Sequence, residues 1–128
     1  MNPQQELYDA LFIRSQDLGF DTYDHLPLEG EPAPYPFVVV GETQTVKSAT
    51  KTALQAEFYI TCHVWGSEEQ RLQVSQMMAQ LDATQILRSK HYAFVQQFND
   101  TDQQQLQDTS VPNTVLNHGV STLAFKLA

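Results

Sequence analysis

Cysteine and glycine are scarce in this chain, and each shortage narrows the range of functions. The single cysteine, Cys62, excludes an internal disulfide, and its place in an apolar alternating run predicts a buried, unreactive thiol. Five glycines leave little material for a phosphate-binding loop, and the sequence contains no Gly-x-Ser-x-Gly motif. We therefore expect neither a disulfide scaffold nor a nucleotide-binding loop.

Positive charge is also in short supply. Seven Lys and Arg stand against fifteen Asp and Glu, so the net charge is −8. The few basic residues are scattered, which disfavours tight binding to a phosphate backbone. An acidic surface suits a protein that lets DNA pass without holding it, although ordinary solubility explains the same charge.

Long hydrophobic runs are missing as well. The longest uncharged apolar run, Phe37 to Val40, is far too short to cross a bilayer. The first residues, Met1 to Glu6, lack the basic and apolar regions of a secretory signal. With 41% hydrophobic residues over 128 positions, the sequence predicts one soluble, cytoplasmic domain spanning residues 1–128, with no membrane partner.

Four histidines are available for chemistry, namely His25, His63, His91 and His118. No two of them have the close spacing of a known metal motif, so we expect no metal site and no cofactor. The adjacent Cys62 and His63 would point to opposite faces of a strand and cannot act as a catalytic pair. We assign no catalytic residue and favour a non-enzymatic role.

The stretch from Ala53 to Leu81 organises the predicted fold. Residues Ala53 to Trp65 predict a strand, because apolar side chains alternate along it. One side of this strand is evenly apolar and carries Phe58, Ile60, Cys62 and Val64. The other side carries Tyr59, Thr61, His63 and Trp65.

An amphipathic helix is predicted directly after this strand. Ser67 is placed as its N-cap, and Gln70 three residues later completes a capping box. Glu68 and Glu69 would then lie where the helix dipole favours negative charge. The helix has one apolar face, made of Val74, Met77, Met78 and Leu81. This face can pack on the apolar side of the preceding strand.

The remaining elements complete an α+β pattern. A first helix is predicted from about Pro3 to Leu18, capped by Asn2 and ended by Gly19. Further strands are predicted at Phe20 to Tyr23, Phe37 to Val46, His91 to Phe98 and Val120 to Leu127. In the third of these, His91 to Phe98, the side chains of Tyr92, Phe94 and Phe98 are placed on one side. Loops are predicted at Asp24 to Pro36 and Asp108 to His118, and Gln103 to Gln107 fits either strand or loop. Ala83 to Leu87 are expected either to continue the central helix or to end it with a short turn. We expect a mainly antiparallel sheet with an N-terminal helix and a central helix packed on it.

Two features outside this core are candidate contact surfaces. Phe12 and Ile13 point away from the leucine face of the first helix. They form either a second contact surface or a cover for the edge of the same core. The segment Lys47 to Thr52 has the composition of a basic hairpin tip, in which Lys47 and Lys51 could meet an acidic partner. A solvated turn is the alternative interpretation.

Three blocks carry a resemblance to a known family: Pro34 to Glu42 with its Pro-Tyr-Pro start and Gly-Glu end, Phe58 to Val74, and His118 to Phe125. In this order they resemble the tail completion or tail terminator proteins of long-tailed bacteriophages and prophages. In that family a later strand ends in Trp and a small residue, and a helix follows directly. The likeness extends from Leu7 to Leu127.

One loop departs from the family pattern. Family members often carry an arginine before the aspartate of the last loop and a glycine after it. Here Gln107 precedes Asp108 and Thr109 follows. The departure leaves the pairing of the final hairpin open.

The resemblance implies a structural role. Such proteins cap the head-proximal end of a finished tail tube as a ring, typically a hexamer, stop polymerisation and join the head connector. The implied partners are further copies of the chain, the tail tube protein and the head connector protein, while DNA passes through without specific binding. The implied location is the virion tail, after assembly in the host cytoplasm.

A ring of identical subunits needs two different patches that fit one another. The candidate interface residues are Phe12, Ile13, Lys47, Lys51, Leu72 and Ala79. The last two are placed on the side of the central helix opposite Val74 and Leu81.

Two alternatives from other classes remain open. One is a small cytoplasmic α+β enzyme that uses His63 with a nearby carboxylate, for which Asp100 and Asp108 are the candidates. The other is a generic α+β adaptor that binds proteins.

Overall fold

The computed structural model describes residues 2–26, 34–47 and 56–128. It contains two α-helices, α1 (Pro3–Asp17) and α2 (Arg71–Asp82), and a short 3-10 helix at Phe98–Asp100. The strands are β1 (Thr22–Tyr23), β2 (Phe37–Lys47), β3 (Ala56–Ser67), β4 (Ile86–Arg88), β5 (Ala93–Gln96), β6 (Asp102–Asp108) and β7 (Leu116–Leu127). The predicted α+β class is confirmed.

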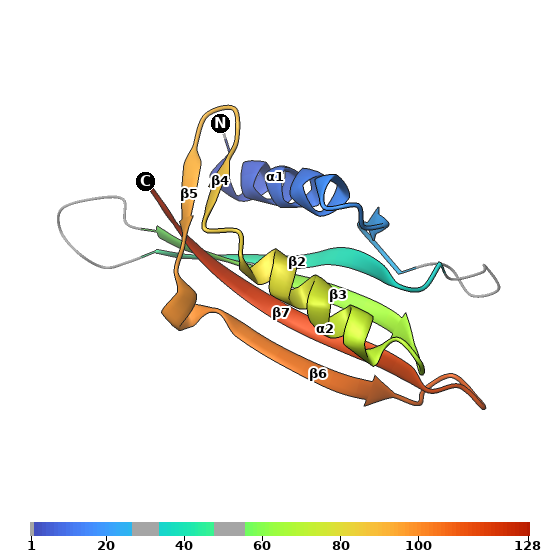
Figure 1. The fold of residues 1–128 in the computed structure, drawn as a ribbon. Coiled ribbons are helices and arrows are strands. Elements are labelled where there is room, and N and C mark those ends of the chain that lie inside the picture. Colours follow the sequence, from blue (N-terminus) through green and yellow to red (C-terminus); the bar gives the residue numbers. More distant parts are fainter. Residues whose placement is uncertain (1, 27–33, 48–55) are drawn as a thin grey trace.

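The strands form one seven-stranded sheet in the order β1-β2-β3-β7-β5-β4, and β6 also pairs with β7. The β1–β2 pair is parallel and every other pair is antiparallel. Strand β7 pairs with β3 on one side and with β5 and β6 on the other. Figure 1 shows α2 lying along β3 and β7, with α1 beside β2 and the β4–β5 hairpin.

The core lies between the helices and one face of this sheet. The side chains of β3 predicted to be apolar and buried, Phe58, Ile60, Cys62 and Val64, are all at most 2% exposed. The predicted apolar face of α2 is buried against them, with Val74 and Leu81 fully covered. Helix α1 adds Leu7 and Leu11 to the same core.

Helix α1 has the predicted ends. The Asn2 side chain accepts a hydrogen bond from the Gln5 backbone N–H at 3.2 Å, and Pro3 occupies the first helical position. After the helix, Gly19 has φ +91°, the left-handed conformation that glycine adopts most easily. In strand β2 a bulge lies near Gly41, because the β2–β3 register shifts between Val40 and Thr43.

The predicted start of α2 is wrong by about three residues. Ser67 stays in the β3–β7 ladder opposite Leu116, and its carbonyl closes a turn with the N–H of Gln70 at 3.0 Å. Helix α2 begins only at Arg71. Half of the expected capping box still forms, because Gln70 Oε1 accepts a hydrogen bond from the Ser67 N–H at 2.9 Å. Glu68 and Glu69 therefore lie in the turn before the helix.

The sequence also misplaced elements after α2. The segment Ala83 to Leu87, expected to continue the helix or end it with a short turn, follows the end of α2 at Asp82 and contains the start of β4. The predicted loop at Asp108 to His118 contains the start of β7. The open case of Gln103 to Gln107 is resolved as strand β6. The final hairpin, left open by its unusual loop, pairs β6 with β7 in register from Asp102–Thr122 to Asp108–Leu116.

The alternation predicted for His91 to Phe98 holds for only part of that segment. Phe94 is fully buried, but Gln96 is the next residue on the buried side and Phe98 is 56% exposed. The reason is that β5 ends at Gln96 and a 3-10 turn follows, which rotates Phe98 outward. Much of the predicted Asp24 to Pro36 loop and the Lys47 to Thr52 tip lie outside the described residues.

Candidate interaction surface

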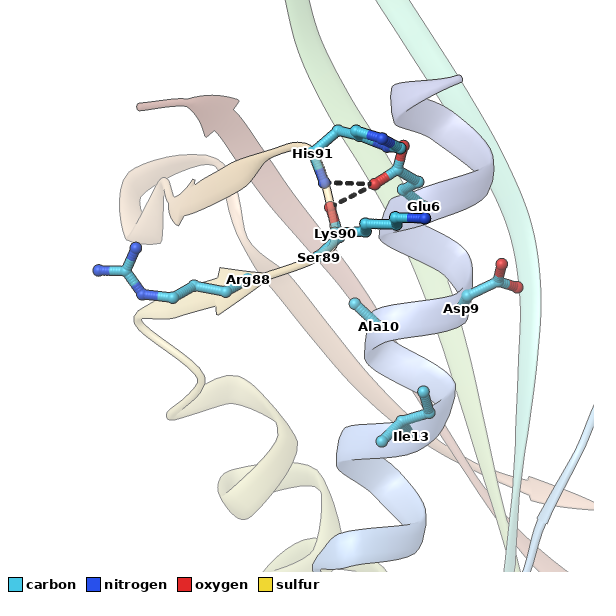
Figure 2. A pocket seen from close by; sticks show the side chains of 8 residues that line it. All are labelled: Glu6, Asp9, Ala10, Ile13, Arg88, Ser89, Lys90 and His91. Atoms are coloured by element: carbon cyan, nitrogen blue, oxygen red, sulfur yellow. Dashed lines mark hydrogen bonds and ion pairs between the residues drawn. The ribbon is translucent and has the colours of Figure 1, made fainter. Parts of the chain in front are cut away.

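A groove runs between α1 and the β4–β5 hairpin, which Figure 2 shows from close by. Glu6 on α1 builds one end of it by holding the hairpin tip. Its carboxylate accepts hydrogen bonds from the Ser89 hydroxyl at 2.8 Å and from the His91 backbone N–H at 3.0 Å. Glu6 Oε2 also lies 2.8 Å from His91 Nδ1. The tip is thus fixed to the first turn of the helix.

Electrostatics support the same contact. Burial alone would raise the pKa of Glu6, but the hydrogen bonds from His91 and Ser89 outweigh it and hold the pKa below its usual value. Glu6 therefore stays ionised at neutral pH and remains an acceptor for the hydrogen bonds from Ser89 and His91.

The groove has a volume of about 510 Å³ and a mixed lining. Lys90 extends toward α1, while Arg88 points away from it (Figure 2). At the other end Ile13 is 55% exposed and also borders a second, smaller hollow that includes Leu18 and Leu87. An apolar residue exposed between two hollows is a suitable anchor for a protein partner.

The outer side of α2 is the second exposed apolar surface. Leu72 is 67% exposed and Ala79 is exposed as well, both on the side away from the buried Val74 and Leu81. The structure thus places Ile13, Leu72 and Ala79 on the outside of the helical layer. Phe12 differs from them, because it is half-buried, packs against the core and has its ring 6.2 Å from that of Tyr8.

The two lysines of the predicted basic tip are only partly placed. Lys47 is exposed and is the last residue of β2. Lys51 lies outside the described residues. The role proposed for the tip therefore stays a prediction.

Sequence reasoning missed several exposed apolar residues at the edges of the sheet. Val46 on β2 is 44% exposed and Leu106 on β6 is 42% exposed. Beyond the short β1, and within the described residues, the outer edge of β2 pairs with no strand, and the same is true of the outer edge of β6. Such edges can accept another chain. The signal in the sequence was Leu106, the one apolar residue in a glutamine-rich run.

His63 lies on the sheet face away from the helices, among residues that the sequence did not group. His63 Nδ1 is 2.9 Å from His118 Nε2 on β7, and His63 Nε2 is 3.3 Å from Glu42 Oε2 on β2. The Trp65 ring stacks on His118 with ring centroids 3.8 Å apart. Each of the three sequence blocks that carry the family resemblance contributes to this cluster.

The carboxylates expected beside His63 are not its partners. Asp100 interacts with Glu57, whose pKa is raised by a hydrogen bond to Asp100 and by burial. Asp108 accepts a hydrogen bond from the Ser110 N–H at 2.8 Å and acts on His118 only through its charge. The carboxylate that meets His63 is Glu42, which the bulge at Gly41 turns toward it.

The predicted burial of Cys62 is confirmed. It is fully buried, and burial raises the pKa of its thiol to about 12, so it does not act as a nucleophile at neutral pH. Among residues 2–26, 34–47 and 56–128, no group of three His, Cys, Asp or Glu converges as a metal site. Over the same residues neither helix has the length and apolar character needed to cross a membrane.

No protein-family model matches the sequence, and neither does any curated protein. The fold, however, is similar to that of a chain in the solved virion of a native gene transfer agent particle. That match has a TM-score of 0.69 and 13% identity, and covers 96% of this chain and 95% of that chain. A second solved protein, which carries no descriptive name, matches with a TM-score of 0.58 and 12% identity over 97% of this chain and 92% of its own. At these identities the similarity concerns the fold.

Proposed function

We propose that this chain is a non-enzymatic structural component of a phage-like particle, of the tail completion type. The observation that carries the proposal is the fold similarity to a chain of the gene transfer agent virion over nearly the full length of both chains. The three sequence blocks that resemble tail terminator proteins support the same assignment. In this role the chain caps the head-proximal end of the tail tube, ends polymerisation and offers the surface that joins the head connector.

The cap is a closed ring of identical copies, as the family resemblance implies, with six as the expected number. Ring closure needs a heterologous contact, in which one patch of each copy meets a different patch of the next. The surface supports this, because Ile13 on α1 and Leu72 on α2 are exposed apolar residues on separate elements. The unpaired outer edges of β2 and β6 offer a second pair of patches.

The enzyme alternative rests on the contact between His63 and Glu42. The Glu42 side chain is 76% exposed, so the pair meets solvent directly. Neither residue lines the groove along α1. Burial gives catalytic carboxylates their raised pKa values, but at Glu42 a backbone hydrogen bond and the contact with His63 together outweigh burial and lower the pKa. This cluster therefore adds little support for catalysis.

The experiment that tests the proposal is imaging of tail tubes from the source particle, prepared without their terminal cap and mixed with the purified chain. We expect electron micrographs to show ring-shaped density at one end of each tube. Bare tubes at saturating concentrations of chain would count decisively against the capping role.

A substitution at Leu72 tests the contact surface. We expect Leu72→Asp to prevent ring formation, because it places a charge in the apolar contact, while its free energy of unfolding stays within about ±0.5 kcal/mol of the original. Gln73→Asp is the matched control, since it adds the same charge at the next exposed position of α2. Rings of normal appearance from Leu72→Asp would remove α2 from the proposed interface.

A further inference from the structure

The contact between His63 and His118 joins two central strands of the sheet. His63 pairs with Val120, and Trp65 pairs with His118. The two histidines are therefore diagonal neighbours across β3 and β7. Their facing ring nitrogens, Nδ1 of His63 and Nε2 of His118, are 2.9 Å apart. The residues are 55 positions apart in sequence, which is why spacing reveals no motif.

The surroundings hold both rings in place. Glu42 Oε2, 3.3 Å from His63 Nε2, is an acceptor for the N–H at that nitrogen, which leaves a lone pair on Nδ1. A Cβ at Gly41 would lie only 3.1 Å from His63 Cδ2, so the ring packs directly on this stretch of β2. On the other side the Trp65 ring stacks on His118 with an interplanar angle of 9°.

We propose that His63 and His118 together bind a divalent transition metal ion such as Ni²⁺, Zn²⁺ or Cu²⁺. Imidazole nitrogens are the ligands that these ions favour, in contrast to Mg²⁺ and Ca²⁺, which take oxygen ligands. Two nitrogens bound to one tetrahedral ion are about 3.3 Å apart for metal–nitrogen bonds of about 2.0 Å. The observed separation needs to widen by only a few tenths of an ångström.

Glu42 supplies the outer contact that such sites use. A metal-binding histidine generally donates its second ring N–H to a carboxylate or carbonyl, which orients the ring and makes the bound nitrogen more basic. Glu42 stands in this position toward His63. The His63 side chain is 21% exposed, so an ion can enter from solvent and keep water on its remaining positions.

Metal binding also sets the tautomer of His118. His118 presents a lone pair at Nε2 when its proton lies on Nδ1. This site is independent of the capping role, because it needs neither a ring nor a tail tube.

The chain contains its own reporter for the test. Its only tryptophan, Trp65, stacks on His118, so a paramagnetic ion at the site should quench the fluorescence. The untagged full chain is titrated with Ni²⁺ at pH 7.5, and Zn²⁺, which does not quench, is then added as a competitor. We expect saturable quenching at one ion per chain, recovery with Zn²⁺ and no response to Mg²⁺.

Three variants decide whether the ion sits where we place it. We expect His63→Gln and His118→Gln each to weaken Ni²⁺ binding at least about tenfold, because each removes one of two ligands, and Glu42→Gln to weaken it about 10- to 100-fold. His91→Gln removes a histidine that contacts a different carboxylate, Glu6, and should bind as the original chain does. Circular dichroism of each variant identifies any that fail to fold.

Two results would overturn the proposal. One is the absence of saturable quenching up to about 1 mM Ni²⁺, which corresponds to negligible affinity. The other is unchanged binding by a folded His63→Gln chain. If His118→Gln unfolds because it loses the stacked ring, His63→Gln and Glu42→Gln still decide the matter.

Discussion

At the scale of single residues, buried polar side chains act mainly as partners for backbone groups. Asn117, which is 1% exposed, donates hydrogen bonds to the carbonyls of Ser67 at 2.8 Å and Glu68 at 3.2 Å. Gln96 Oε1 accepts one from the Gln85 N–H at 2.9 Å. The sequence could not reveal these roles, because Asn117 resembles a turn residue and Gln96 interrupts an apolar alternation. Cys62 was predictable, since its neighbours two positions away are apolar on both sides.

Asp82, the last residue of α2, carries a prediction at this scale. Partial burial raises the pKa of its carboxyl to about 6, well above its value in an unfolded chain. The folded state therefore binds more protons between about pH 4 and pH 6, and ionised Asp82 opposes folding at pH 7. We expect Asp82→Asn to raise the free energy of unfolding at pH 7.5 by about 1 kcal/mol, a figure discounted for the solvent-exposed part of the side chain.

Urea denaturation of both chains at pH 7.5 and pH 4 checks this expectation. The difference in stability should shrink as the pH falls through 6, because Asp82 then becomes neutral like the asparagine. His118, whose lowered pKa reduces stability as the pH falls, is present in both chains and cancels from the difference. A difference that does not change with pH would mean that the carboxyl is solvated in the folded state.

At the scale of elements, strong alternation of apolar residues and clear capping residues predicted α1, β2 and β3 from the sequence. Short or polar elements were not predicted. Strand β4 has three residues, and β6 has one apolar residue in seven. Neither therefore shows the alternation of apolar and polar residues that predicts a strand. Each is a strand because its backbone pairs with a neighbouring strand: β4 with β5, and β6 with β7. The start of α2 was misplaced for a similar reason, since pairing with Leu116 keeps Ser67 in β3.

The close packing of α2 on β3 gives a prediction at this scale. A Cβ at Gly66 would lie 2.6 Å from Val74 Cγ2, and valine in a helix has little freedom to move. We expect Gly66→Ala to push α2 off the sheet and to lower the free energy of unfolding by about 1–3 kcal/mol. The measurement is chemical denaturation of the original and the variant.

A Val74→Ala background shows whether the clash is the cause. Because Val74→Ala removes Cγ2, the added effect of Gly66→Ala should be smaller in that background than in the original chain. Equal losses in both backgrounds would point to the Gly66 backbone conformation instead of the contact with the helix.

At the scale of the whole molecule, the sequence predicted the α+β class and the layer of helices on the sheet, but not what long-range pairing brings together. The groove along α1 depends on Glu6 meeting Ser89 and His91, more than 80 positions later. The cluster of Glu42, His63 and His118 depends on the register of three strands. The periodicity of a sequence predicts neither the register between strands nor where a hairpin packs. These two sites can therefore be recognised only in the folded structure.

The proposed role also belongs to this scale, because capping needs one surface that meets further copies and another that meets the tube. The exposed side chains of Ile13 and Leu72 and the open edges of β2 and β6 are the surfaces available for these two contacts. A subunit with several such surfaces is suited to assembly within a larger particle.

Arrest of tube growth is the most direct test of this account. Uncapped tail tubes are incubated with the chain, supplied with fresh tube protein, and measured by electron microscopy over time. We expect tubes treated with the chain to keep their length, while untreated tubes and tubes treated with Leu72→Asp continue to grow. Equal growth with and without the chain would contradict the proposed role as a tail cap.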